Sequence, residues 1–197
     1  MIPRQLMLAA LVMILLALGM GFYAWHMRGG ASRPETAFSQ PLAPPASGPS
    51  EAVTLYVADD NGGFLRAQPA RIPLPAGRQE RAEELLRALL SVYLDKSSPH
   101  TLDPSSEVRD VYLVDPGLAV IDLNAAFADG HRSGVLIEEL TVASLVETLS
   151  ANIPGITRAK ILVDGRERDT LAGHLDLTNF YDMTAFAQLV LQLQATH

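Results

Sequence analysis

The stretch that decides the fold is SGVLIEELTVASLVETLSANIPGITRAKILVDG, residues Ser133 to Gly165. Apolar residues recur at helical spacing from Leu136 to Ile153, and Pro154-Gly155 ends that pattern. A run with strand composition follows at Thr157–Val163, and Asp164-Gly165 turns it. The stretch therefore predicts one long amphipathic helix, then a strand and a turn.

The sequence predicts two main helices, each with a single buried apolar stripe. The first extends from Gly77 to about Leu94, and its stripe comprises Ala82, Leu85, Leu86, Leu89, Leu90 and Tyr93. The stripe of the second helix comprises Leu136, Leu140, Ala143, Val146, Leu149 and Ile153. Glu138 and Glu139 stand near the start of the second helix, where the helix dipole favours negative charge.

Strand patterns precede and follow the long helix. Val108–Val114 and Leu118–Leu123 flank Asp115-Pro116-Gly117, which predicts a tight hairpin. Further extended segments are expected at Val53–Ala58, Phe64–Leu74 and Leu171–Thr178. The prolines of Phe64–Leu74 make that segment irregular or place it at a sheet edge. These elements predict an α/β fold of the two-layer α+β kind, with a small mixed sheet packed by two main helices.

The N-terminal quarter of the chain is expected to attach this domain to a membrane. Leu6 to Trp25 contains no charged residue over twenty positions, which is long enough to cross a hydrocarbon core of about 30 Å. A cleaved signal peptide is the alternative, but its apolar region is usually about 7–15 residues long. We therefore expect residues 1–28 to be a transmembrane signal anchor, with the following domain outside the cytoplasmic membrane of a bacterium.

The remaining boundaries follow from composition. Residues 29–50 are rich in proline, alanine and serine, without an apolar period, so they are expected to be a linker. Residues 51–181 form the folded domain, and residues 182–197 are expected to form a C-terminal amphipathic helix. From Glu51 onward, 12 basic residues stand against 21 acidic ones, a formal charge of −9. This balance argues against binding of nucleic acid.

Motifs that carry catalysis or bind cofactors do not occur in the sequence. There is no cysteine, and the nucleophile-elbow, phosphate-loop, dinucleotide-binding and H-E-x-x-H patterns are all missing. The cluster Asp59–Gly63 has the composition of a calcium loop, but Val57 occupies a position that requires an acid or amide, so a turn is expected. The sequence therefore assigns no catalytic, cofactor or metal residues, and no enzyme is predicted.

One group of polar residues supports an alternative hypothesis. Asp122, Asp164, His174 and Asp176 all fall at expected strand ends or turns. If they converge at one edge of the sheet, they could bind a divalent cation or a small polar ligand, since histidine and carboxylates suit zinc or manganese. The competing interpretation is that these acids bond to local backbone groups of their own turns. An envelope enzyme or ligand-binding domain is the functional alternative that this cluster would support.

Several words of the sequence resemble the GerMN domain, a module of sporulation and germination proteins. They are LYVADD (55–60), AVIDLNAAF (119–127), LTVASLVETLS (140–150) and VDGRERDTLAGHLDLT (163–178), within a resemblance that covers Val53 to Tyr181. This sequence contains only one copy of the resembling domain. The resemblance implies a small α/β fold, exported or attached to a membrane, for which no catalytic residues are expected. It implies a binding or assembly role with envelope proteins or cell-wall material as partners, and leaves homo-oligomers open.

Overall fold

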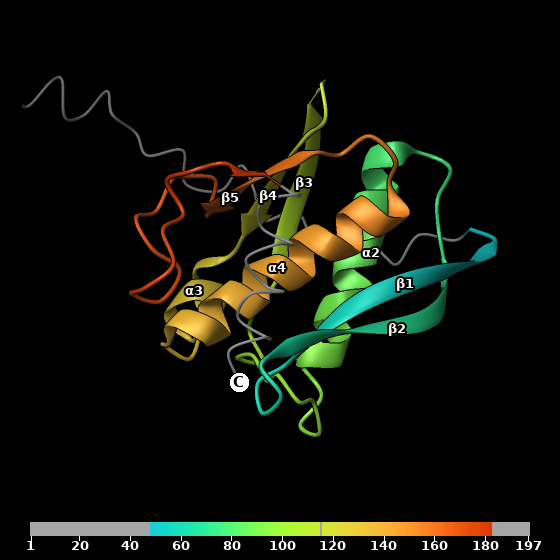
Figure 1. Cartoon of the computed structure of the whole chain (residues 1–197). Helices are drawn as coiled ribbons and strands as arrows, with labels where there is room; N and C mark the ends of the chain where they lie inside the picture. Colours follow the sequence, from blue (N-terminus) through green and yellow to red (C-terminus); the bar gives the residue numbers. More distant parts are fainter. Residues whose placement is uncertain (1–47, 115, 183–197) are drawn as a thin grey trace, which may run out of the picture. The chain divides into compact units, whose positions relative to one another are not determined.

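Two β-sheets and two long helices make up the part of the chain that the computed structural model describes, residues 48–114 and 116–182 (Figure 1). These residues belong to one compact unit. In chain order, the elements are β1 (Ser50–Asp59), β2 (Phe64–Pro73), α2 (Arg78–Tyr93), β3 (Val108–Val114), β4 (Leu118–Leu123), α3 (Ala125–Asp129), α4 (Val135–Asn152), β5 (Arg158–Val163) and β6 (Tyr181–Asp182). The predicted order of long helix followed by strand is confirmed as α4 and β5.

The main sheet has four strands in the order β3-β4-β5-β6. β3 and β4 form the predicted antiparallel hairpin, β5 runs parallel to β4 after the crossover through α4, and β6 pairs antiparallel with β5. The hairpin requires glycine at Gly117, whose φ is +72°. A side chain there would also come within 2.6 Å of the carbonyl oxygen of Gly155. The predicted mixed sheet is thus confirmed.

β1 and β2 form a second, two-stranded antiparallel sheet, whereas the sequence predicts a single small sheet. The reason lies at the edge of β1 that faces away from β2. Three amide N–H groups on that edge donate to helix side chains, namely Thr54 to Asn152 Oδ1 (3.1 Å), Tyr56 to Thr148 Oγ1 (3.0 Å) and Ala58 to Tyr93 Oη (2.9 Å). Because helices satisfy these donors, no other strand of the described residues pairs with β1 there.

Pro69 lies at the free edge of β2. It pairs with Thr54, whose N–H points away from β2. Residues opposite each other in an antiparallel pair share this orientation, so the nitrogen of Pro69 also faces outward. Proline has no N–H to leave unpaired, and it discourages another strand from adding to this edge. The prediction that this segment lies at a sheet edge is confirmed.

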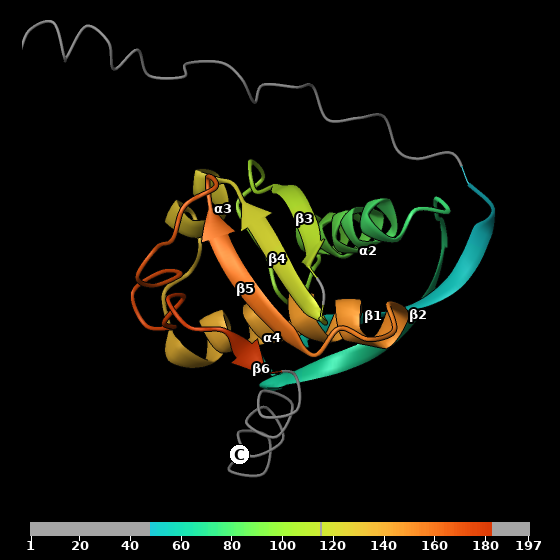
Figure 2. The same cartoon turned by 90° about the horizontal axis from the view of Figure 1, so that it is seen from above.

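Helix α4 lies between the four-stranded sheet and β1 (Figures 1 and 2). The prediction of a single apolar stripe is therefore wrong for this helix. Leu140, Ala143, Val146 and Leu149 are buried as expected, and so are side chains on the other faces: Glu138, Thr141, Val142, Ser144, Leu145 and Thr148. Packing against two sheets buries α4 nearly all round, because each sheet covers a different face.

Helix α2 follows its prediction closely. It runs beside the edge strand β3 and also contacts β1 and α4 (Figure 2). Its buried residues are the six of the predicted stripe, and Gly77 and Leu94 flank it as the N-cap and C-cap residues. Since α2 packs with one face only, its apolar spacing alone identifies the residues that are buried.

The segment Leu171–Thr178, expected to be extended, contains no strand. It folds into an irregular loop with one isolated bridge, between Thr170 and Asp176. The anchor predicted at residues 1–28, the linker up to residue 47 and the helix predicted beyond residue 182 lie outside the described residues. Within residues 48–114 and 116–182, no helix is both long and apolar enough to span a membrane.

Candidate functional site

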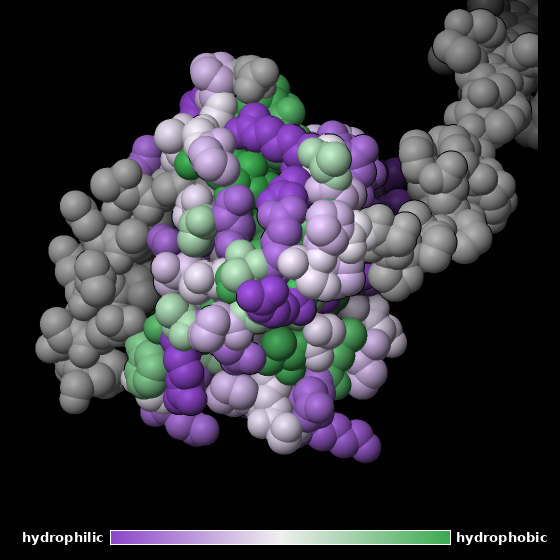
Figure 3. Space-filling model, turned by 90° about the vertical axis from the view of Figure 1, so that its right-hand side faces the viewer, coloured by the Kyte–Doolittle hydropathy of each residue, from purple (hydrophilic) through white to green (hydrophobic). Residues whose placement is uncertain are grey.

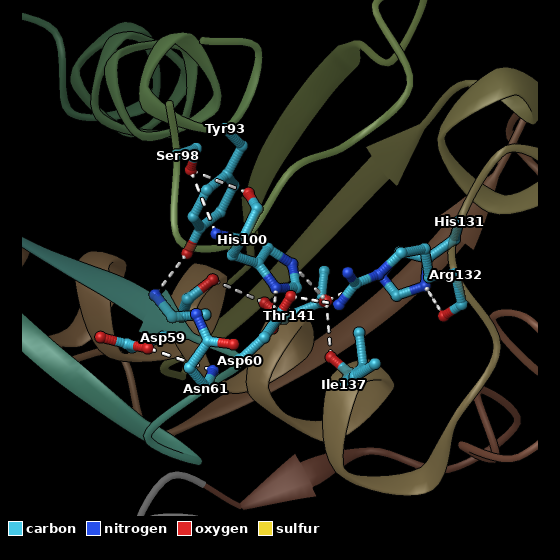
Figure 4. A network of polar contacts seen from close by, with 12 residues as sticks. Asp59, Asp60, Asn61, Tyr93, Ser98, His100, His131, Arg132, Ile137 and Thr141 are labelled. Carbon is cyan, nitrogen blue, oxygen red and sulfur yellow. Dashed lines mark hydrogen bonds and ion pairs between the residues drawn. The ribbon is translucent and has the colours of Figure 1, made fainter. Parts of the chain in front are cut away.

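Four segments far apart in the sequence bring polar side chains together beside α4 (Figure 4). Asp60 comes from the turn after β1, His100 from the loop after α2, His131 from the segment after α3, and Thr141 from α4. His100 Nδ1 lies 2.6 Å from Asp60 Oδ1, and its Nε2 lies 2.9 Å from Thr141 Oγ1. His131 Nε2 lies 2.7 Å from the same hydroxyl oxygen. Arg132 pairs with Asp60 from the outside.

The chain from carboxylate to imidazole to hydroxyl has the order of groups that activates a nucleophile in hydrolases. Here, however, the hydroxyl is fully buried, and it also bonds to the carbonyl oxygen of Ile137 at 2.8 Å. A nucleophile has to reach a substrate, whereas Thr141 already has three partners inside the protein. Burial also disfavours the charged form of His131 and so lowers its pKa. The arrangement joins four segments of the fold.

Glu138, in the first turn of α4, is a fully buried carboxylate. It accepts backbone N–H groups from the residue before α4 and from the loop at 171–178: Gly134 at 3.1 Å, Ala172 at 3.0 Å, His174 at 3.1 Å and Leu175 at 2.9 Å. His174 Nδ1 adds a contact of 3.0 Å. Burial alone would raise the pKa of Glu138, but these hydrogen bonds lower it to about 2. The loop at 171–178 is therefore irregular because its amides converge on this carboxylate.

Asp122 and Asp164, two residues of the proposed cluster, lie close together at the end of β4 and β5. Asp122 Oδ1 accepts the N–H of Gly165 at 2.7 Å, and Arg109 donates to Asp164 Oδ1 at 2.8 Å. Arg109 also lies 3.7 Å from Asp122. Burial raises the pKa of Asp122, and the Gly165 hydrogen bond acts against that rise. This pair holds the turn after β5 in place.

His174 and Asp176, the other two residues of the cluster, belong to the loop at 171–178. His174 contacts Glu138 and Ser133, while Asp176 accepts the N–H and hydroxyl of Thr178 at 2.8 and 2.6 Å. Through the described ranges, no hydrogen bond links these two residues to Asp122 or Asp164. No group of three or more histidines and acids in the described residues could hold a metal ion. The structure thus distributes the four residues over three separate networks: Asp122 with Asp164, His174 with Glu138, and Asp176 with Thr178.

A pattern in the sequence marks the buried polar residues of α4, which the spacing of the apolar residues did not identify. Five polar residues of α4 recur at helical spacing: Glu138, Thr141, Ser144, Thr148 and Asn152. A polar stripe normally indicates a solvated face. Here four of the five are buried. Glu138 bonds to the loop at 171–178, Thr141 to the imidazoles and Thr148 to β1, while Ser144 donates to the carbonyl oxygen of Thr141 within α4. Small hydroxyl residues in place of lysine and arginine are the feature that marks such a buried polar stripe.

One face of the four-stranded sheet is left uncovered by the described helices (Figure 2). The strand register places three rows of side chains on this open face: Val114, Leu118 and Arg158; Tyr112, Val120 and Lys160; Asp110, Asp122 and Leu162. Tyr112 and Val114 are 44% and 47% exposed, and Phe180, beside Arg158 and Lys160, is 57% exposed. Figure 3 shows a different side, where hydrophilic residues are interspersed with smaller apolar areas.

Comparison with known proteins gives one family and several solved structures. The family model described as "Germane: Sporulation and spore germination" matches residues 54–169. The tandem GerMN domains of the sporulation protein GerM from Bacillus subtilis are 18% identical, with a TM-score of 0.52, over 70% of this chain and 48% of that chain. The first GerMN domain of GerM is 20% identical, with a TM-score of 0.48, over 68% and 98%.

A candidate lipoprotein from Clostridium perfringens is also 20% identical, with a TM-score of 0.48, over 73% of this chain and 93% of that chain. No curated protein matches the chain. At 18% identity, the match to the tandem domains supports a likeness of fold. It carries no information about a ligand or an activity.

Proposed function

The chain belongs to the Germane family and contains a GerMN-like domain; from this premise, we propose that it is a non-enzymatic module that binds partner proteins in the bacterial cell envelope. In this proposal, the apolar segment Leu6–Trp25 anchors the chain in the cytoplasmic membrane, and residues 29–50 space the domain from the bilayer. The family description and the apolar segment support an extracytoplasmic position for the domain.

The observation that carries the proposal is the open face of the four-stranded sheet. Three of the five exposed large hydrophobic residues in the described part of the chain, Tyr112, Val114 and Phe180, lie on it or beside it. Aromatic residues and arginine are the types enriched in protein–protein interfaces, and here Arg158 lies over the ring of Phe180. The face therefore has the composition of a binding surface.

The polar groups of the domain support a binding role over chemistry. Glu138, Thr141 and Asp122 are buried, and each is engaged by partners from the protein itself. A catalytic group needs access to a substrate, and the exposed residues in the three rows of the open face are Tyr112, Val114 and Arg158. We therefore place the proposed function on the open face and propose a partner protein with an apolar surface that carries an acidic residue opposite the exposed Arg158.

Photo-crosslinking in intact cells tests this proposal. A photoreactive phenylalanine analogue replaces Tyr112 in the full chain, and a matched chain carries it at Gln68, an exposed position of β2. We expect the Tyr112 position to give discrete crosslinked products and the Gln68 position to give at least tenfold less. Changing Val114 to serine beside the probe should reduce the yield severalfold, because it removes apolar contact area.

The mass of the product identifies the partner. A product of two chain lengths indicates a second copy, and any other discrete mass indicates a different envelope protein. Equal yields from Tyr112 and Gln68, or no product from either, would contradict the use of this face.

A further inference from the structure

The network around Thr141 (Figure 4) holds more contacts than its neutral groups can satisfy with hydrogens. Five contacts each need one hydrogen. Three involve Thr141 Oγ1, which lies 2.9 Å from His100 Nε2, 2.7 Å from His131 Nε2 and 2.8 Å from the Ile137 carbonyl oxygen. The other two join His100 Nδ1 to Asp60 Oδ1 (2.6 Å) and His131 Nδ1 to the Arg132 carbonyl oxygen (2.7 Å). A neutral imidazole carries one N–H and a hydroxyl carries one O–H. Two neutral rings and one hydroxyl therefore leave two of the five contacts without a hydrogen.

The acceptors determine where the ring hydrogens lie. A carboxylate and a carbonyl can only accept, so the Nδ1 atoms of His100 and His131 must both carry the hydrogen. In the neutral state, both Nε2 lone pairs would then face one hydroxyl, which has a single hydrogen to give. One ring nitrogen would be left against the oxygen of Thr141 at less than 3 Å with no hydrogen between them. In a buried site such a contact is destabilising.

We propose that the folded domain binds one extra proton here, on Nε2 of His100, so that His100 is an imidazolium paired with the Asp60 carboxylate at neutral pH. His100 then donates to both Asp60 and Thr141. The Thr141 hydroxyl donates to His131 Nε2 and shares its hydrogen with the Ile137 carbonyl. With this proton, each Nε2 contact has a hydrogen.

Of the charged side chains that face the two rings, Asp60 decides which ring takes the proton, because it bonds directly to His100. His131 instead faces a neutral carbonyl, and burial disfavours a charge on it. Arg132 pairs with Asp60 from the exposed side, and Glu138 of α4 acts electrostatically on His131. Tyr93 of α2 presents its ring edge to His100 at 4.7 Å between centroids. Asp60 and Glu138 thus balance Arg132 and the imidazolium.

The proton would control how firmly the loop between α2 and β3 is attached. His100 is 1% exposed and is the buried polar side chain of that loop that reaches α4. The adjacent backbone contacts are Asp60 N–H to the Pro99 carbonyl at 3.2 Å and Leu102 N–H to the Tyr93 carbonyl at 3.1 Å. Without this proton, one of the His100 contacts has no hydrogen, so the attachment of the loop weakens.

Nuclear magnetic resonance of the full chain in detergent micelles, with histidine labelled with ¹⁵N, tests the protonation directly. The chain has five histidines, so each ring can be assigned by single substitutions. At pH 7 we expect His100 to show hydrogens on both ring nitrogens and His131 to show one. A bare ring nitrogen on His100 at pH 7 would overturn the proposal, whatever the variants do.

Two variants of the same turn provide the matched comparison. Asp60→Asn removes the charge that holds the proton, so His100 should show a single ring N–H. Asp59→Asn changes the neighbouring carboxylate, which pairs with Arg66, and should leave His100 doubly protonated. At pH 7, the hydrogen-exchange protection of the Leu102 amide should fall at least tenfold in Asp60→Asn and change little in Asp59→Asn. Equal protection in the two variants would contradict the control of the loop.

Discussion

Helices α2 and α4 start alike and end up in opposite environments. Each begins after a glycine that supplies no side-chain cap, Gly77 or Gly134, and each has one glutamate in its first turn. Glu80 of α2 is exposed, whereas Glu138 of α4 is fully buried and accepts four backbone N–H groups. The same local pattern therefore gives a surface charge in one helix and an internal anchor in the other.

The difference comes from the number of layers that each helix touches. α2 packs with one stripe, and its other side holds charged residues, such as Glu84 and Arg87, which pair with each other. α4 lies between two sheets, and its polar stripe meets protein on every side. A polar stripe on a surface helix gains from water, but on a central helix each polar group needs a specific partner.

The sharpest test of this comparison is to remove the two first-turn glutamates in turn. Glu138→Ala leaves several buried N–H groups without an acceptor, so we expect the free energy of unfolding to fall by about 3–5 kcal/mol. Glu80→Ala removes only an exposed charge at a helix start, with an expected loss of about 0.5 kcal/mol. Denaturant unfolding of both variants measures the difference, and equal losses would remove the distinction between the helices.

Acid titration should reveal the same carboxylate. The pKa of Glu138 is lowered from 4.5 to about 2, so its stabilising contribution is complete above pH 4.5 and is lost as pH falls toward 2. A shift of this size corresponds to about 3 kcal/mol. Between those pH values, the free energy of unfolding of the unchanged chain should fall by that much more than that of Glu138→Gln. Parallel pH curves would show that Glu138 does not carry the acid dependence.

The smallest expected effect concerns the far end of the polar stripe. Thr148→Val keeps the shape of the side chain but removes the acceptor of the Tyr56 N–H. We expect a loss of about 1–2 kcal/mol in the free energy of unfolding, because one buried donor loses its partner. Ser150→Ala, in the same turn, removes a bond within α4 itself and should cost under about 0.5 kcal/mol. A larger effect at Ser150 than at Thr148 would contradict the role of the stripe in covering β1.

Much of the local structure could be predicted from the sequence. The apolar spacing of α2 predicted its six buried residues, and Pro116-Gly117 predicted the hairpin between β3 and β4. Short sequence motifs were enough to recognise the family. The turn at Asp59 was also correct, since its carboxylate accepts the N–H groups of Asn61 and Gly62. These features depend on interactions within a few residues, or on a single periodic face, which the order of residues displays directly.

The tertiary structure alone decided the separate β1–β2 sheet, the irregular loop at 171–178 and the buried polar network. Glu138 meets Leu175 from 37 positions away, and Thr141 meets His100 from 41 positions away. The stretch Leu171–Thr178 has the composition of a strand, but its amides bind a carboxylate that the folding of α4 brings to them. Periodicity shows which side chains share a face, whereas the partner of a buried polar group depends on which distant segments pack against that face.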